Sequence, residues 1–154
     1  MGKSCSTPPI LILVYSDALE EITDRAFSTL PEDAPLQDAL VHIFSSFIRF
    51  YERHPENARH FLKELLFDTG ERRYQQQFGS LSKGFLERLA QLVRRAQQRG
   101  EIRQDVDPQQ AASSFFALYF AAVTAWLGSF LILDSTSFDQ LRAMFDLQIK
   151  GMLP

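Results

Sequence analysis

The chain has 154 residues, a length that favours one domain with its own hydrophobic core. A net charge of -3 argues against a protein that binds nucleic acid over its whole surface. The single cysteine, Cys5, excludes an internal disulfide and any zinc site built from several cysteines, and it fits a reducing, cytoplasmic setting. The 14 phenylalanines require a large buried interior.

Apolar residues recur at helical spacing along most of the chain, whereas the period-two alternation typical of strands is rare. The pattern predicts an irregular segment over residues 1–12 and one domain over residues 13–154. Six helices are expected in that domain, with breaks at PEDAP (31–35), Pro55, FDTGE (67–71), DVDP (105–108) and DSTS (134–137). The chain is therefore expected to fold as an all-α protein, a single bundle of about six helices.

Residue types that are typical of helix ends stand near the last two breaks. Gly100 follows the longest amphipathic segment and suits a left-handed C-terminal cap. Asp107 suits the N-cap of the next helix, expected over residues 109–133, and Pro108 suits its first turn. Ser137 and Gln140 have the spacing of a capping box at the start of the final helix, expected over residues 138–152.

Residues 111–133 contain no charged side chain, which fits either a transmembrane helix or a helix buried in a water-soluble bundle. The other expected helices have apolar faces that need partners, and none has membrane length, so we expect the buried helix and no membrane association. Small or short side chains form a stripe along one of its faces: Gln110, Ala117, Ala121, Thr124 and Gly128. Such a stripe allows close helix approach, and a second copy of the chain is the simplest partner.

Three segments share the pattern of one known family. They are LVRRAQQRGEIRQDVDPQQAASSFFALYFAAVTAWL (92–127), FIRFYERHPENARHFLKELLF (47–67) and the chain ending LQIKGMLP. Together they resemble the C-terminal half of the TetR/AcrR bacterial transcriptional regulators, over roughly residues 14–154. The resemblance implies an effector-binding and dimerisation domain whose last two helices pair across a two-fold axis into a four-helix interface. The interface residues expected from it and from the small-residue stripe are Ala117, Ala121, Thr124, Gly128, Leu141 and Phe145.

The resemblance does not extend to MGKSCSTPPILI, residues 1–12. Regulators of this family carry a three-helix DNA-binding domain with a helix-turn-helix in that place. A misassigned start codon, a truncated gene and a stand-alone sensor domain are three explanations that the sequence leaves open. DNA binding is expected only through a helix-turn-helix that is not in this chain.

Aromatic residues on the inward helix faces are the candidate ligand site. They are Phe44, Phe47, Phe61, Phe78, Phe85, Phe115, Tyr119 and Trp126. Rings this bulky fill a core without gaps only when smaller residues alternate with them, so a cavity for a small apolar or cationic effector is expected among them. The same rings could instead form a solid core. The polar groups expected near the cavity are the Tyr119 hydroxyl, His42 and Gln77.

Signals for other functions are weak. Glu56, His60 and Glu64 could share a helix face as metal ligands, but a solvated polar face opposite Phe61 and Leu65 is the favoured interpretation. Ser80 and Lys83 have the S-x-x-K spacing of serine acylases without the companion motifs. No catalytic activity, cofactor or metal is therefore expected. The two functions that stand are the ligand-sensing, dimerising part of a TetR-like repressor and a helical protein–protein interaction module without a ligand.

Overall fold

Six α-helices make up the computed structural model, which describes residues 10–67, 72–129 and 137–154. They are α1 (Ile10–Ser28), α2 (Leu36–Arg53), α3 (Pro55–Phe67), α4 (Arg72–Gln98), α5 (Pro108–Leu127) and α6 (Ser137–Lys150). These described ranges contain no strand. The expectation of an all-α bundle of six helices is therefore confirmed.

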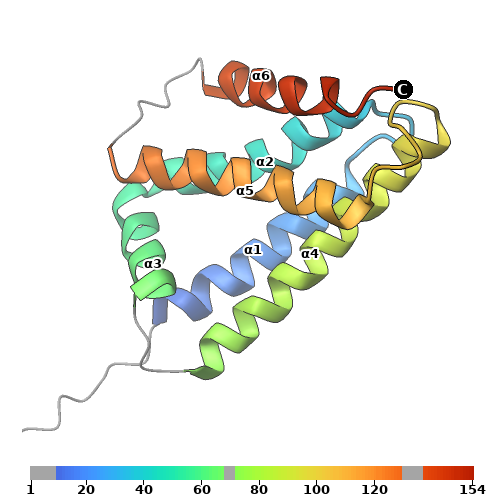
Figure 1. The fold of residues 1–154 in the computed structure, drawn as a ribbon. Coiled ribbons are helices and arrows are strands. Elements are labelled where there is room, and N and C mark those ends of the chain that lie inside the picture. Colours follow the sequence, from blue (N-terminus) through green and yellow to red (C-terminus); the bar gives the residue numbers. More distant parts are fainter. Residues whose placement is uncertain (1–9, 68–71, 130–136) are drawn as a thin grey trace, which may run out of the picture.

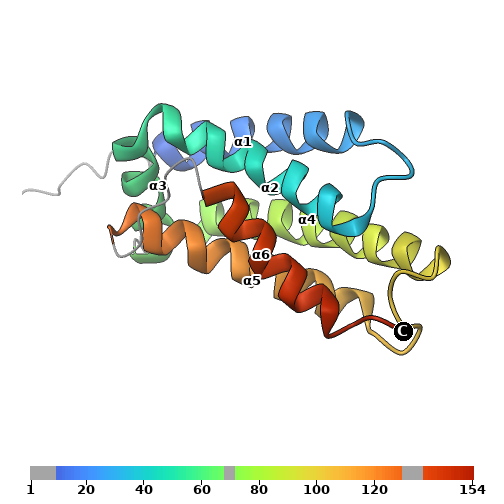
Figure 2. The same ribbon diagram turned by 90° about the horizontal axis from the view of Figure 1, so that it is seen from above.

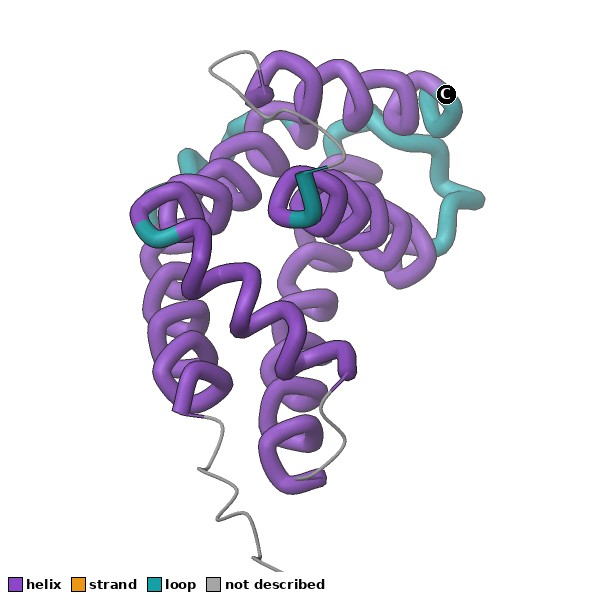
Figure 3. Tube along the Cα trace, turned by 90° about the vertical axis from the view of Figure 1, so that its left-hand side faces the viewer, coloured by secondary structure: helices purple, strands orange, loops and turns teal. Residues whose placement is uncertain are grey.

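The helices enclose an interior between α2, α4 and α5. The long helices α1 and α4 run side by side as the diagonal pair of Figure 1, and α5 packs against α4. Helix α6 lies over α2 and α5, on the side away from α1 (Figures 1 and 2). Helix α3 closes one end of the bundle, where it contacts α1, α2 and α5 (Figure 3).

The turn between α4 and α5 holds three distant parts of the chain together. Gly100 adopts φ +77°, which confirms the expected left-handed cap. The next residue, Glu101, accepts a hydrogen bond from the backbone N–H of Leu36 at 3.1 Å and so caps the first turn of α2. The backbone N–H of Arg103 donates to the carbonyl of Met152 at 3.0 Å, which fixes the end of the chain.

Helix α5 starts where the sequence predicts and ends earlier. The Asp107 carboxylate accepts from the backbone N–H of Gln109 at 2.8 Å, and Pro108 is the first helical residue. The expected extension to residue 133 is wrong for residues 128 and 129. Gly128 is the C-terminal cap and Ser129 has φ +64°, a left-handed conformation that ends an α-helix. Residues 130–136 lie outside the described part of the chain.

Helix α1 begins earlier than expected. The backbone of Ile10 to Ile12 is helical, although residues 1–12 were expected to be irregular. Proline is tolerated in the first turn of a helix, so Pro8 and Pro9 do not prevent a helix from starting at the next residue. Residues 1–9 lie outside the described part of the chain.

Helix α5 is long and apolar enough to span a membrane by length and composition, and it is the one such helix in the described ranges. A core helix of a water-soluble protein passes the same test. Side chains of α5 such as Ala112, Phe115 and Tyr119 lie in the core formed with α2, α4 and α6. The helix is thus a packed element of this bundle.

Candidate functional site

One half of the aromatic interior is solid. Phe44, Phe115 and Phe145 come from α2, α5 and α6, and each has 0% of its side chain exposed. Their rings are close: the centroids of Phe44 and Phe145 are 5.3 Å apart, and those of Phe115 and Phe145 are 5.8 Å apart. Separations of this size are typical of directly packed rings. Phe44 and Phe115 therefore belong to the core beneath α6.

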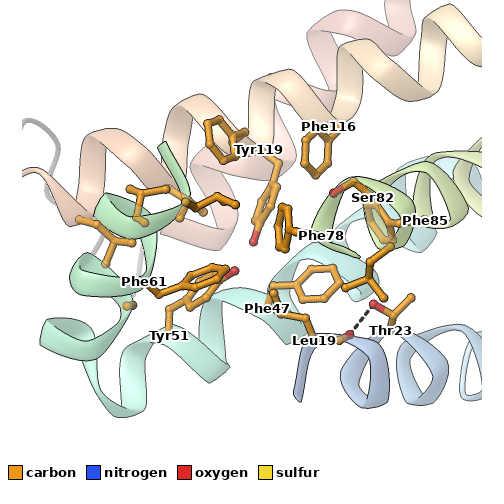
Figure 4. A pocket seen from close by; sticks show the side chains of 17 residues that line it. Leu19, Thr23, Phe47, Tyr51, Phe61, Phe78, Ser82, Phe85, Phe116 and Tyr119 are labelled. Carbon is orange, nitrogen blue, oxygen red and sulfur yellow. Dashed lines mark hydrogen bonds between the residues drawn. The ribbon is translucent and has the colours of Figure 1, made fainter. Parts of the chain in front are cut away.

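The other half of the aromatic interior is hollow. A pocket opens between α1, α2, α3, α4 and α5, next to the solid half (Figure 4). Seven aromatic side chains whose positions Figure 4 labels line it: Phe47, Tyr51, Phe61, Phe78, Phe85, Phe116 and Tyr119. Aliphatic side chains complete the wall: Leu19, Leu62, Leu65, Leu81, Val123 and Leu127. The sequence-based expectation of a ring-lined cavity in this bundle thus matches the geometry in part.

The pocket contains about 670 Å³ of space without protein atoms, part of it open to solvent at the mouth. The enclosed cavity within it has a volume of about 70 Å³. Known small-molecule sites have volumes of about 300–1,000 Å³, so the cavity is smaller than such sites in this conformation. A molecule of more than a few atoms therefore fits only if the lining side chains move apart.

Polar groups in the pocket are few and uncharged. The hydroxyls of Tyr51 on α2 and Tyr119 on α5 both point into it and lie near each other (Figure 4). Burial raises the pKa of both phenols above the ordinary value, so both remain neutral at physiological pH. The Thr23 hydroxyl donates to the carbonyl of Leu19 at 2.6 Å. Ser82 carries the remaining hydroxyl that lines the pocket.

Five of the eight residues expected at the ligand site line the pocket: Phe47, Phe61, Phe78, Phe85 and Tyr119. Phe44, Phe115 and Trp126 do not. At about 100° per residue, the pocket side of α5 is centred on Phe116 and Val123, and Phe115 and Trp126 lie roughly 60–100° away from these two residues. Phe115 meets α6, and Trp126 is half-buried against the core.

Two expected polar groups lie elsewhere. The Nε2 atom of His42 is 3.1 Å from the carbonyl of Ala26 and 3.0 Å from the hydroxyl of Thr29, so it joins α2 to the end of α1. Gln77 is exposed in an outer groove between α1 and α4. Neither residue contributes to the pocket.

Sequence reasoning did not include three of the lining aromatic residues: Tyr51, Phe116 and Phe120. Tyr51 follows Phe47 by four residues, so helical spacing could have added it to the site. Phe116 and Phe120 stack on each other with centroids 6.0 Å apart, along the face of α5 that also carries Tyr119. They stand in a stretch where nearly every residue is apolar, and such a stretch does not reveal which side is inward.

The residues expected at a dimer interface separate into two sets. Ala117, Ala121 and Gly128 are exposed and Thr124 is half-buried, on the side of α5 that no other described helix covers. Leu141 and Phe145 are 3% and 0% exposed in the chain's own core. These two side chains face α2 and α5, so a partner chain could reach α6 only through its other side. That side carries Ala143 and Leu147, and Leu147 is 75% exposed.

The candidate metal ligands are not assembled into a site. Glu56 and His60 are exposed on α3, as the solvated-face interpretation predicts. No group of three or more His, Cys, Asp or Glu side chains is placed to bind a metal ion within the described ranges. Ser80 and Lys83 are exposed on α4.

Comparisons with solved structures support the same fold. A putative TetR-family transcriptional regulator from Rhodococcus sp. is 21% identical, with a TM-score of 0.66 over 92% of this chain and 74% of that one. The fatty acid degradation regulator FadR from Bacillus halodurans is 15% identical, with a TM-score of 0.73 over 93% and 75%. A protein of unknown function from Rhodococcus sp. RHA1 is 17% identical, with a TM-score of 0.67 over 95% and 71%.

Sequence comparison gives the family directly. No curated protein sequence matches the chain. The family described as the tetracyclin repressor-like, C-terminal domain matches residues 37–146, which is more than half of the chain and runs from α2 into α6. The chain belongs to the tetracyclin repressor-like C-terminal domain family of the TetR transcriptional regulators.

Proposed function

We propose that the chain is the ligand-sensing and dimerising domain of a TetR-like repressor that acts in the cytoplasm. The observation that carries the proposal is the pocket itself: an apolar cavity with neutral hydroxyls, inside a regulator-type helical domain. Ring-lined concave sites with a few polar groups are typical of small-molecule binding. Binding there would change the packing between α1 and the other helices, because Leu19 and Thr23 of α1 form part of the wall.

Dimerisation is the second half of the proposal. Exposed small residues on α5, Ala117 and Ala121, lie on a side that no described helix of the chain covers. Leu147 of α6 adds an exposed apolar side chain. Two helices from each chain could bury the roughly 1,200–2,000 Å² of a typical stable interface. A second chain is therefore the partner that this side fits best.

A fluorescence titration tests the sensing function. N-phenyl-1-naphthylamine is uncharged, apolar and much brighter outside water, so it reports on an apolar cavity without a charged group. We expect saturable binding of one probe per chain. Phenylalanine in place of Ser82 would fill the pocket from α4, so the Ser82→Phe variant should lose this binding.

The matched control is Ser80→Phe, the same substitution on the same helix at an exposed position outside the pocket. This variant should bind the probe as the unchanged chain does. Equal binding by the Ser82→Phe variant, or the absence of saturable binding by the unchanged chain, would refute the sensing function. In that case the remaining function is the helical interaction module, which needs the outer surface of the bundle and not its interior.

A further inference from the structure

The pocket wall carries information on the class of molecule that it accepts. Among the described residues, no Asp, Glu, Lys, Arg or His side chain lines it. Two arginines lie beside lining residues, and each already donates to another group of the protein. Arg59 donates to the carbonyl of Leu127 at 2.7 Å, and Arg88 pairs with Asp24 at 2.7 Å. A charged ligand would therefore lose its hydration in this pocket without gaining an opposite charge.

The hydroxyl pair gives the pocket one free donor. At most one of the two protons is used between the Tyr51 and Tyr119 oxygens, so the other remains for a ligand. The Tyr51 ring is packed against Tyr15, whose ring stacks on it with centroids 6.3 Å apart. The Tyr51 hydroxyl is thus held in place, aimed into a space that is otherwise lined by carbon (Figure 4).

We propose that the pocket selects an uncharged, mainly apolar molecule with one hydrogen-bond acceptor oxygen, a ketone, ester or alcohol, that accepts a hydrogen bond from the Tyr51 and Tyr119 pair of hydroxyls. The inference rests on the proposed sensing function and narrows its ligand class. It excludes cationic molecules, although rings line the site. A ring face attracts a cation, but that attraction alone does not replace the hydration of a buried charge.

The experiment compares molecules that share a ten-carbon chain and differ at one end. 2-Decanone, 1-decanol, decanoate and decyltrimethylammonium compete with N-phenyl-1-naphthylamine at pH 7.5, where decanoate is ionised. We expect 2-decanone and 1-decanol to bind at least about 100-fold more tightly than either ion, as measured by displacement of the probe. The ions lose their hydration in the pocket without gaining an opposite charge. A charged competitor within tenfold of 2-decanone, or failure of 2-decanone to displace a bound probe, overturns the inference.

A tyrosine variant tests the donor. The double variant Tyr51→Phe/Tyr119→Phe removes both hydroxyls and should weaken the binding of 2-decanone by about tenfold, the value of one hydrogen bond, while the affinity for the probe stays the same. Tyr15→Phe is the matched control, because Tyr15 packs against the same rings but does not line the pocket. Far-ultraviolet circular dichroism shows that both variants are folded. An unchanged affinity in the double variant, or an equal loss in Tyr15→Phe, overturns the assigned role of the two hydroxyls.

The outcomes separate this inference from the proposed function. Saturable probe binding with a preference for an ion would leave the sensing function standing and refute the neutral ligand class. The absence of saturable probe binding would refute both.

Discussion

Phe115 and Phe78 are the same amino acid in two different environments. Phe115 is fully buried against Phe145, whereas Phe78 is half-buried at the wall of the pocket and touches Phe61 with centroids 5.8 Å apart. Phe115→Ala should lower the free energy of unfolding by about 3–5 kcal/mol, the usual cost of removing a buried ring. Phe78→Ala should cost clearly less, because its ring already borders empty space. Urea denaturation of both variants measures the difference.

The two variants should also differ in binding. Phe78→Ala should change the affinity for N-phenyl-1-naphthylamine, and Phe115→Ala should leave it close to that of the unchanged chain. If both variants lose the same stability and neither changes binding, the hollow half of the interior is solid in solution.

Glu101 is a second residue with a specific structural task. Its carboxylate caps α2 at Leu36 and binds Arg99 at 2.6 Å, and its side chain is 32% exposed. Glu101→Ala should lower the free energy of unfolding by about 1–2 kcal/mol, the upper range for loss of a helix cap. Asp105→Ala is the control, since the Asp105–Arg103 pair is exposed and such pairs contribute about 0–1 kcal/mol. A smaller loss for Glu101→Ala than for Asp105→Ala would contradict the capping role.

Residue roles were only partly predictable from the sequence. Spacing on one helix placed Phe47, Phe85 and Tyr119 on inward faces, because the helical period is a local property. The division of the rings between solid core and pocket depends on the rotation of α5 relative to α6, and that rotation is set by tertiary contacts. For this reason Phe115 and Phe145 were assigned to the wrong surroundings, and Tyr51 was not assigned to the pocket.

At the scale of helices, two glycines show how position decides the effect of the same substitution. A Cβ atom at Gly84, inside α4, would meet no atom within 4 Å. Gly84→Ala should raise the free energy of unfolding by about 0.5–1 kcal/mol, because alanine is the better helix former. Gly100→Ala should lower it by about 1–2 kcal/mol, since alanine is strained at φ +77°. Urea denaturation should therefore show a higher free energy of unfolding for Gly84→Ala and a lower one for Gly100→Ala. A change of the same sign in both variants would contradict these roles.

Helix ends with a local chemical signal were predictable. The Asp107 carboxylate accepts a hydrogen bond from a backbone N–H of its own turn. Gly100, which has no side chain, adopts the left-handed conformation that ends its own helix. The end of α5 at Leu127 was not predictable, because Gly128 stands within an apolar run that extends to residue 133. The capping of α2 by Glu101 was also hidden, since the two residues of that contact are 65 positions apart.

At the scale of the whole molecule, the uncovered side of α5 predicts the oligomeric state. Ala121→Glu places a charge on that side, where the chain itself leaves the residue exposed. The variant should fold with nearly unchanged stability as a monomer, because an unpaired charge buried between two chains costs several kcal/mol. Sedimentation equilibrium should show a dimer for the unchanged chain and a monomer for the variant.

Ser28→Glu is the control for that measurement. It adds the same charge at an exposed position of α1, a helix that packs against α2, α3 and α4, and should remain dimeric. A monomeric unchanged chain at tens of micromolar, or a dimeric Ala121→Glu variant, would refute the interface.

Binding of a small apolar molecule inside the bundle can be observed residue by residue. Nuclear magnetic resonance of the ¹⁵N-labelled chain is the most direct test. On titration with 2-decanone, we predict saturable shifts of the backbone amides of residues that line the pocket, above all Tyr51, Phe61, Tyr119 and Val123. The amide of Leu147, on the exposed side of α6, should not move at the same concentrations. Shifts confined to exposed residues of α5 and α6, or shifts that grow linearly without saturation, would contradict the account.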